Sequence, residues 1–289
     1  MKKRLLLLLT LAILSCKNTP EPLDKDSDFD LAITNIEIID LEKGDLLQNK
    51  TVFIKNDLIS AISDSQSNTS TATQVIDGTG KFLLPGFWDN HVHFRGGDSL
   101  ISANKNFLAL FLANGITTLR ECGGDMTSTI LDWQQKIANK QLAGPTIYTS
   151  GPKLDGKNAR WEGSLEIASE EDIAPALDSL QLLETDFVKL YDSKFTGELY
   201  LKTIKAAEKR KLISSGHMPF SVTLEETTAA GMDGIEHLYY VLKACSAEED
   251  AITKDIIAGK TSFWASLDRV MHTYNKESAK TAFATLKSR

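Results

Sequence analysis

The 289-residue sequence predicts an α/β protein in which an incomplete (β/α)8 TIM barrel follows a small N-terminal β subdomain. After Pro85-Gly86, short apolar runs and helical stretches alternate repeatedly, which implies a parallel sheet. Before that point, residues 29–85 contain only short β-like segments. No G-x-G-x-x-G string follows the first predicted barrel strand, so a dinucleotide-binding fold lacks its fingerprint.

The first residues predict an export signal rather than part of the fold. Residues 2–4 are basic, and Leu5 to Leu14 form an apolar run too short to span a bilayer. The string Ile-Leu-Ser-Cys16 resembles a bacterial lipobox, in which the cysteine is lipidated. The alternative is an ordinary secretory signal that ends near a cysteine. We expect residues 1–16 to be a lipoprotein signal peptide, residues 17–28 a polar tether, and the protein to be exported and lipid-anchored at Cys16 to a bacterial membrane, on the periplasmic side or cell surface.

Charge and cysteine content exclude two classes of function. The net charge is −7, and no dense Lys/Arg cluster follows the first residues, which argues against a nucleic-acid partner. Beyond Cys16, the chain holds only Cys122 and Cys245, without a C-x-x-C pair. We therefore expect two buried free thiols, no disulfide framework and no cysteine zinc site.

Residues 29–85 predict a small sheet. The segments FDLAITNIEIID, TVFIKNDLISAIS and TQVIDGTGKFLLPG alternate apolar with polar residues and are interrupted by Lys, Asn, Asp and Gly turns. We expect several antiparallel strands, with the polar segment SDSQSNTSTATQ as a loop between two of them.

Six apolar runs after residue 85 predict the strands of the barrel. They span residues 87–94, 115–122, 145–151, 186–192, 211–217 and 233–239. The longest loop, Lys153 to about Ser169, follows the third run, and loops after barrel strands face the active site. Arg160 and Trp161 in this loop are candidate substrate contacts, the alternative being an exposed connector anchored by its tryptophan.

Four of the five histidines end predicted barrel strands. His91 and His93 form a His-Val-His triplet at the end of the first run, and His217 and His237 end the fifth and sixth. Residues two apart on a strand point to the same face, and imidazole is the commonest zinc ligand. The alternative is a set of hydrogen-bonded core histidines. His272 lies in a helical segment and is expected to be a surface or packing residue.

Several strings together resemble the metal-dependent amidohydrolase superfamily, and its imidazolonepropionase-like and prolidase-like members most. VIDGTGKFLLPGFWDNHVHF is similar to the entry motif, where a small β-sandwich leads through Pro-Gly into the first barrel strand. GITTLRECGG, FVKLYD, SSGHMP and GIEHL resemble the second, fourth, fifth and sixth strands, although Glu121 stands where the family usually has aspartate. The resemblance implies that residues 29–85 are the N-terminal part of the sandwich, and residues 86–289 about six of the eight βα units.

The resemblance also implies a ligand set for two divalent metal ions. His91 and His93 would bind one ion, His217 and His237 the other, and a carboxylated Lys189 would bridge them. Imidazole and carbamate ligands suit zinc, but manganese, iron or cobalt would fit the same ligand set. Burial lowers the pKa of a lysine enough to supply the neutral amine that a carbamate requires. The alternative for this lysine is a side chain that snorkels from a strand end.

Tyr191 is a candidate catalytic residue. It lies two residues after Lys189, so it shares a face with that lysine and could hydrogen-bond the substrate carbonyl oxygen or the developing oxyanion. Asp192 is expected not to face inward.

The function that follows is hydrolysis of a small molecule at a carbon–nitrogen bond other than an ordinary peptide bond, or of a dipeptide. A metal pair would hold a hydroxide that attacks the carbonyl of an amide or cyclic amide. Two alternatives stay open: a catalytically inactive fragment or metal- or ligand-binding lipoprotein, and a phosphotriesterase-like esterase on the same scaffold.

The C-terminal part departs from the family pattern. After GIEHLYY the sequence predicts helices up to Arg289, without a seventh or eighth strand. The family's proton-transferring aspartate ends the eighth strand, whereas Asp268 lies in a helical run. An unclosed parallel barrel exposes two sheet edges. We therefore expect a fragment of a longer protein with little activity of its own, or a short protein whose edges a partner covers.

Overall fold

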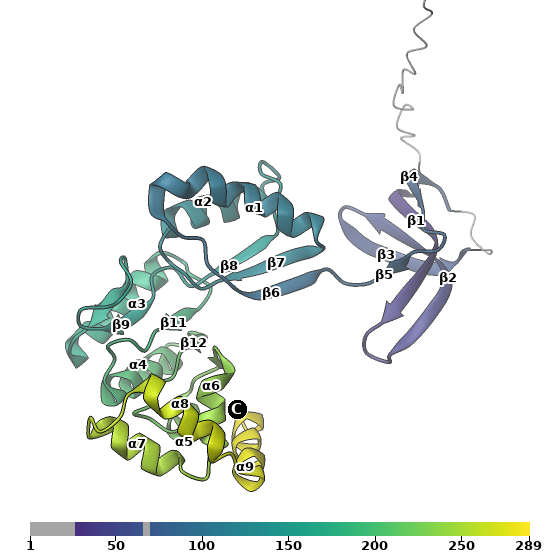
Figure 1. The fold of residues 1–289 in the computed structure, drawn as a ribbon. Helices are drawn as coiled ribbons and strands as arrows, with labels where there is room; N and C mark the ends of the chain where they lie inside the picture. Colours follow the sequence, from purple (N-terminus) through teal and green to yellow (C-terminus); the bar gives the residue numbers. More distant parts are fainter. Residues whose placement is uncertain (1–26, 66–69) are drawn as a thin grey trace, which may run out of the picture. The chain divides into compact units, whose positions relative to one another are not determined.

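The structure is a computed structural model that describes residues 27–65 and 70–289 (Figure 1). The predictions for the signal peptide, for Cys16 and for nearly all of the tether therefore lie outside the described residues. The chain divides into two compact units, Met1–Pro85 and Gly86–Arg289, and each is described by itself.

The described part of the first unit forms one five-stranded sheet. Its strands are β1 (Phe29–Asp40), β2 (Asp45–Lys55), β3 (Leu58–Asp64), β4 (Ala72–Asp77) and β5 (Phe82–Leu83). The order is β3-β2-β1-β4, and β5 pairs with β1. Ala32 and Ile36 of β1 and the adjacent Val52 and Phe53 of β2 are buried in this unit.

Two pairings in this sheet differ from the expected antiparallel arrangement. β1, β2 and β3 are antiparallel neighbours joined by short turns, but β4 and β5 both run parallel to β1. β4 therefore does not pair with β3, which precedes it in sequence, but with β1 on the side opposite β2.

The second unit begins with a parallel three-stranded sheet that two helices cover on one face (Figure 1). The strands are β6 (Phe87–Val92), β7 (Ile116–Glu121) and β8 (Thr146–Thr149), and the helices are α1 (Ile101–Ala113) and α2 (Thr127–Ala138). Their apolar core includes Phe94, Leu108, Leu119, Ile130 and Trp133.

A second, five-stranded sheet follows β8 in the chain. It has the order β10-β9-β11-β12-β13, with β9 (Leu154–Gly156), β10 (Leu165–Ile167), β11 (Val188–Leu190), β12 (Ser214–Gly216) and β13 (Gly234–Ile235). The helices between these strands are α3 (Ile173–Leu182), α4 (Gly197–Lys209) and α5 (Leu224–Ala230). The Asp186 amide donates to the Thr149 carbonyl at 2.9 Å and so connects this sheet to β8. All registered strand pairs in both sheets are parallel.

Two predicted segments have a different conformation. The loop expected from Lys153 to Ser169 contains β9 and β10, and β9 pairs with β11, so part of this segment extends the sheet. The strand expected over residues 233–239 ends at Ile235, and helix α6 (Leu238–Ala244) takes its last two residues. A short apolar run such as residues 233–239 shows neither strand nor helix periodicity clearly, so its sequence fits both conformations. The tertiary packing decides between them.

After β13 the described chain is helical, as expected, and carries only one isolated β-bridge, Ser246 to Tyr274. The helices are α6, α7 (Glu249–Ile257), α8 (Phe263–His272) and α9 (Lys276–Lys287). His272 is exposed at the end of α8, which confirms the surface prediction. Cys122 and Cys245 are buried free thiols, also as predicted. None of the described helices is both long enough and apolar enough to cross a membrane.

Candidate metal centre

The end of β6 brings two imidazoles together. The Nε2 atoms of His91 and His93 lie 2.9 Å apart, and Val92 between them points into the apolar core. The shared face expected from the His-Val-His spacing is thus present. Two nitrogens bound to one tetrahedral zinc at about 2.0–2.1 Å would be about 3.3 Å apart, so this pair is close to ligand geometry.

Two later strands extend this pair into a row of four histidines. The ring centroid of His237 lies 4.9 Å from that of His91 and 4.8 Å from that of His217. Gly216 allows β12 to approach β11, since a Cβ there would collide with the Leu190 carbonyl. His237 has a φ of 69°, a strained value for a non-glycine residue that surrounding structure must impose. We call His93, His91, His237 and His217 the histidine row.

Lys189 lies at the centre of β11 with its side chain fully buried. Its Nζ has no hydrogen-bond partner among the described residues, and the Glu236 Oε1 lies 3.9 Å away. Burial lowers the pKa of this lysine. A buried amine without a partner is costly, so the structure contains a nitrogen that requires either a neutral state or a ligand.

Glu236 links His91 of the histidine row to residues of β7 and β12 by hydrogen bonds. Its carboxylate accepts hydrogen bonds from the His91 Nδ1 at 2.6 Å, the Arg120 Nη1 at 2.7 Å and the Ser215 Oγ at 2.6 Å. Burial raises the pKa of Glu236, but the hydrogen bond from His91 and the charge of Lys189 outweigh burial and hold the pKa below its usual range. This role of Glu236 is not among the sequence-based predictions. Its place directly before His237 at a strand end is a signal for it, because a carboxylate buried there needs hydrogen-bonding partners.

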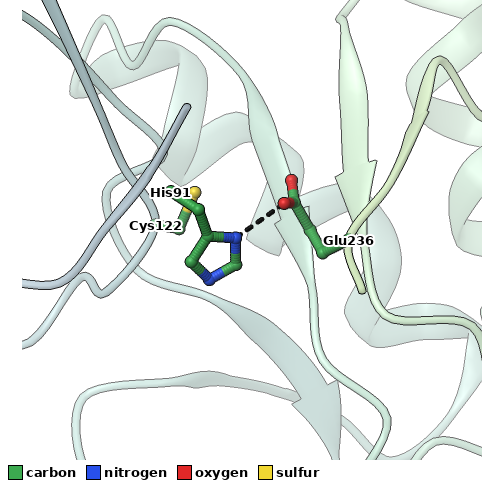
Figure 2. Close-up of side chains that lie close together, drawn as sticks. All are labelled: His91, Cys122 and Glu236. Carbon is green, nitrogen blue, oxygen red and sulfur yellow. Dashed lines mark hydrogen bonds and ion pairs between the residues drawn. The ribbon is translucent and has the colours of Figure 1, made fainter. Parts of the chain in front are cut away.

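Figure 2 shows a different group of possible metal ligands, made of His91, Cys122 and Glu236. Their ligand atoms lie within 4.8 Å of one another. Burial raises the pKa of the Cys122 thiol to about 11, whereas a metal binds the thiolate. The Glu236 oxygens also already accept three hydrogen bonds. This group therefore suits a metal ion less well than the histidine row.

Asp192 faces the site, contrary to the sequence-based expectation. Its Oδ1 lies 2.9 Å from the His217 Nδ1, and the Tyr240 hydroxyl donates to its Oδ2 at 2.5 Å. The alternation of a strand does not extend to Asp192, because β11 ends at Leu190. A carboxylate on one ring nitrogen holds an imidazole in the orientation and tautomer that leave the other nitrogen free for a metal.

Burial favours the neutral imidazole at His93, His217 and His237. Burial, followed by the charge of Arg95, lowers the pKa of His93 to about 3. Burial and the neighbouring His217 lower the pKa of His237 to about 4, and burial also lowers the pKa of His217. Neutral imidazole is the metal-binding form. With the buried His93 Nδ1 and Lys189 Nζ both lacking partners among the described residues, this donor set fits a divalent metal.

The other predicted site residues border the row. The Tyr191 ring lies 4.3 Å from that of His217, and the Trp161 ring lies 6.3 Å from that of Tyr191. Arg160 is next to Trp161 in sequence and lies over its ring at 5.7 Å. The structure thus brings all the predicted ligands and contacts to one region, and their roles stay predictions.

Comparison with known proteins identifies the family. The sequence model of the amidohydrolase family matches residues 82–269, which include every residue of the histidine row and Lys189. The chain belongs to the amidohydrolase family. The resemblance inferred from the strand motifs is thereby confirmed.

Individual relatives of this amidohydrolase carry different names. It is 36% identical over 90 residues to an adenine deaminase from Listeria welshimeri, covering 31% of this chain and 14% of that enzyme. It is 27% identical over 207 residues to an adenine deaminase from Staphylothermus marinus, covering 66% of this chain and 32% of that enzyme. The chain thus spans a third or less of these relatives.

A solved structure confirms the fold class of this amidohydrolase. A candidate prolidase from Bifidobacterium longum superposes with a TM-score of 0.66 at 19% identity, over 88% of this chain and 71% of that one. At this identity the likeness shows the fold alone. The family thus rests on the sequence match over residues 82–269, and the solved structure adds the fold.

Proposed function

We propose that this amidohydrolase is a metal-dependent hydrolase that cleaves a carbon–nitrogen bond, other than an ordinary peptide bond, in a small molecule or a dipeptide. The observation that carries this proposal is the histidine row beside a fully buried lysine whose amine has no hydrogen-bond partner among the described residues. A buried amine without a hydrogen bond is costly to the fold, and together with the imidazoles it offers a ligand set for divalent cations.

In this proposal the site holds two divalent ions, with zinc as the first candidate. His91 and His93 bind one ion, His217 and His237 bind the other, and a carboxylated Lys189 contacts both. Carboxylation joins the Lys189 nitrogen to carbon dioxide and releases a proton, which gives an anion with two oxygen ligands. The burial of Lys189 supports the neutral amine that this reaction needs.

The chain's own residues orient and polarise the substrate. When bound, the metal ions would activate water and polarise the scissile carbonyl group. Tyr191, beside His217, is positioned to donate a hydrogen bond to the carbonyl oxygen. Glu236 orients His91, and Asp192 with Tyr240 orients His217.

The experiment that tests this function combines metal content with turnover. We expect the chain to bind about two zinc ions and to show a low turnover that a chelator abolishes. The turnover is read as amine released from a dipeptide, as ring opening of a cyclic amide, or as ammonia released from adenine. The matched control is His272→Asn, because His272 is exposed and outside the row. Metal binding without turnover would favour the ligand-binding lipoprotein, and faster cleavage of a phosphotriester would favour the esterase.

Asp192→Asn is expected to weaken zinc binding by about 10- to 100-fold, because His217 loses the carboxylate that orients it. The measurement is the zinc dissociation constant by competition with a chromogenic chelator. Asp178→Asn is the control, since Asp178 is an exposed residue paired with Arg210. An unchanged dissociation constant for the Asp192 variant would show that the contact with His217 does not orient the ligand.

We also propose that the protein is exported and anchored to a bacterial membrane by lipid on Cys16. The support is the basic residues 2–4, the apolar run and the position of the cysteine. Labelling of expressing cells with a radioactive fatty acid tests this proposal, and Cys16→Ser should abolish the label.

A further inference from the structure

Three cationic side chains surround the indole ring of Trp161. The Arg95 Cζ lies 4.5 Å from the ring centroid, the Arg160 Cζ lies 5.7 Å from it, and the Lys153 Nζ lies 5.9 Å from it. The aromatic face attracts each cation, but the cations repel one another. Their convergence on one ring leaves a positive potential that an anion would neutralise.

Within the part of the chain that the structure describes, only Lys153 of these three cations has an internal counter-ion. The Lys153 Nζ is buried and donates to the Asp125 carboxylate at 3.0 Å and to the Gly123 carbonyl. Among residues 27–65 and 70–289, Arg95 and Arg160 form no ion pair, and both side chains are exposed. Two guanidinium groups, with planar sets of N–H donors, therefore remain available to a ligand.

This cluster borders the histidine row. Trp161 contacts Tyr191, and Tyr191 contacts His217. At the other end of the row, Arg95 follows His93 by two residues, and its positive charge contributes to the low pKa of that histidine. A ligand held by the two arginines would therefore have its remaining atoms near the imidazoles.

We propose that Arg95, Arg160 and Trp161 form a subsite for a carboxylate on the substrate, distal to the scissile bond. The proposal rests on the function proposed above and narrows its substrate class to amides with an anionic end, such as N-acyl amino acids or dipeptides. Guanidinium groups bind carboxylates with paired, charge-assisted hydrogen bonds, and the indole supports the apolar part of the ligand. An uncharged heterocycle would leave both arginines without a partner.

The test measures binding rather than cleavage. N-acetyl-L-leucine and its uncharged counterpart N-acetyl-L-leucinamide are titrated calorimetrically into the full chain, with adenine as a third probe. We expect the acid to bind at least about tenfold more tightly than the amide, because one charge-assisted interaction is sufficient for that ratio. Arg95→Gln and Arg160→Gln should each reduce the ratio several-fold, and the double variant should bring it to about one.

Lys157→Gln is the matched control, because it removes one exposed positive charge from the same segment without touching Trp161. A ratio that falls equally in this control would show a general charge effect and overturn the subsite. Three other results would also overturn the subsite. They are an unchanged acid-to-amide affinity ratio in the Arg160 variant, tighter binding of methyl phosphate than of N-acetyl-L-leucine, and tight adenine binding that is the same in the variants of both arginines. The assay needs no turnover, so a failed subsite would leave metal-dependent hydrolysis standing, and a failed hydrolysis would leave the binding result standing.

Discussion

Lys189→Met is expected to stabilise the metal-free protein while it reduces the capacity to bind divalent metal. The Lys189 side chain is fully buried, and its Nζ has no hydrogen-bond partner among the described residues. Methionine has a similar length and fills the same space without an amine to desolvate. Removal of an unsatisfied buried polar group is worth about 1–3 kcal/mol in the free energy of unfolding. Because Lys189 is the proposed bridging ligand, the variant should at the same time bind at least one zinc ion fewer than the unmodified protein.

Urea unfolding in the presence of a chelator measures the first effect, and zinc content after dialysis measures the second. The matched control is Lys243→Met, because Lys243 is just as buried but satisfied. Its Nζ donates to the carbonyls of Phe220 and Val222 and to the Thr253 hydroxyl, at 2.6–3.0 Å. This variant should lose stability and keep its zinc content. If the Lys189 variant behaves like the control in both measurements, Lys189 is a structural residue and not a ligand.

Glu236→Ala is expected to destabilise the protein by about 3 kcal/mol, because it leaves the Arg120 guanidinium in a largely buried position without a counter-ion. It also removes the hydrogen-bond acceptor of the His91 Nδ1, so zinc affinity should fall about 10- to 100-fold. The two effects are separable, since unfolding is measured without metal and affinity is measured on the folded protein.

A double-mutant cycle with Arg120→Met tests the assigned cause. The double variant should be less destabilised than the sum of the two single variants, because neither charge is then left alone. Asp268→Ala, which removes an exposed carboxylate from α8, should leave stability unchanged within error. Additive effects in the cycle would refute the paired-charge explanation.

Much of the site could be predicted because its ligands end strands. Parallel strands place their carboxyl ends at one edge, so His91, His93, His217 and His237 had to converge if the β/α alternation was correct. Lys189 followed from the same alternation, since Val188 and Leu190 pack into the apolar core on either side of it.

The contacts that orient these ligands could not be predicted. Glu236 reaches His91 across 145 positions in sequence, and Tyr240 reaches Asp192 across 48. Asp192 was expected to point away because the alternation of β11 was extended past Leu190, where the strand in fact ends. The segment from Lys153 to Ser169 is a loop by its sequence pattern, yet it contains two short strands that pair with each other, and β9 also pairs with β11 at Leu190. These pairings join residues that are distant in sequence, so the local pattern does not reveal them.

The amino-acid pattern by itself determined the alternation of strands and helices after residue 85, the boundary motif at Pro85-Gly86 and the chemical identity of the metal-ligand candidates. These properties depend on local alternation and on which residues stand at strand ends. Only the tertiary structure decided which carboxylate orients which imidazole, which buried amine has no hydrogen bond within the described residues, and which cations gather around Trp161. Those are distances between side chains far apart in sequence, and they are set by how the sheets and helices pack.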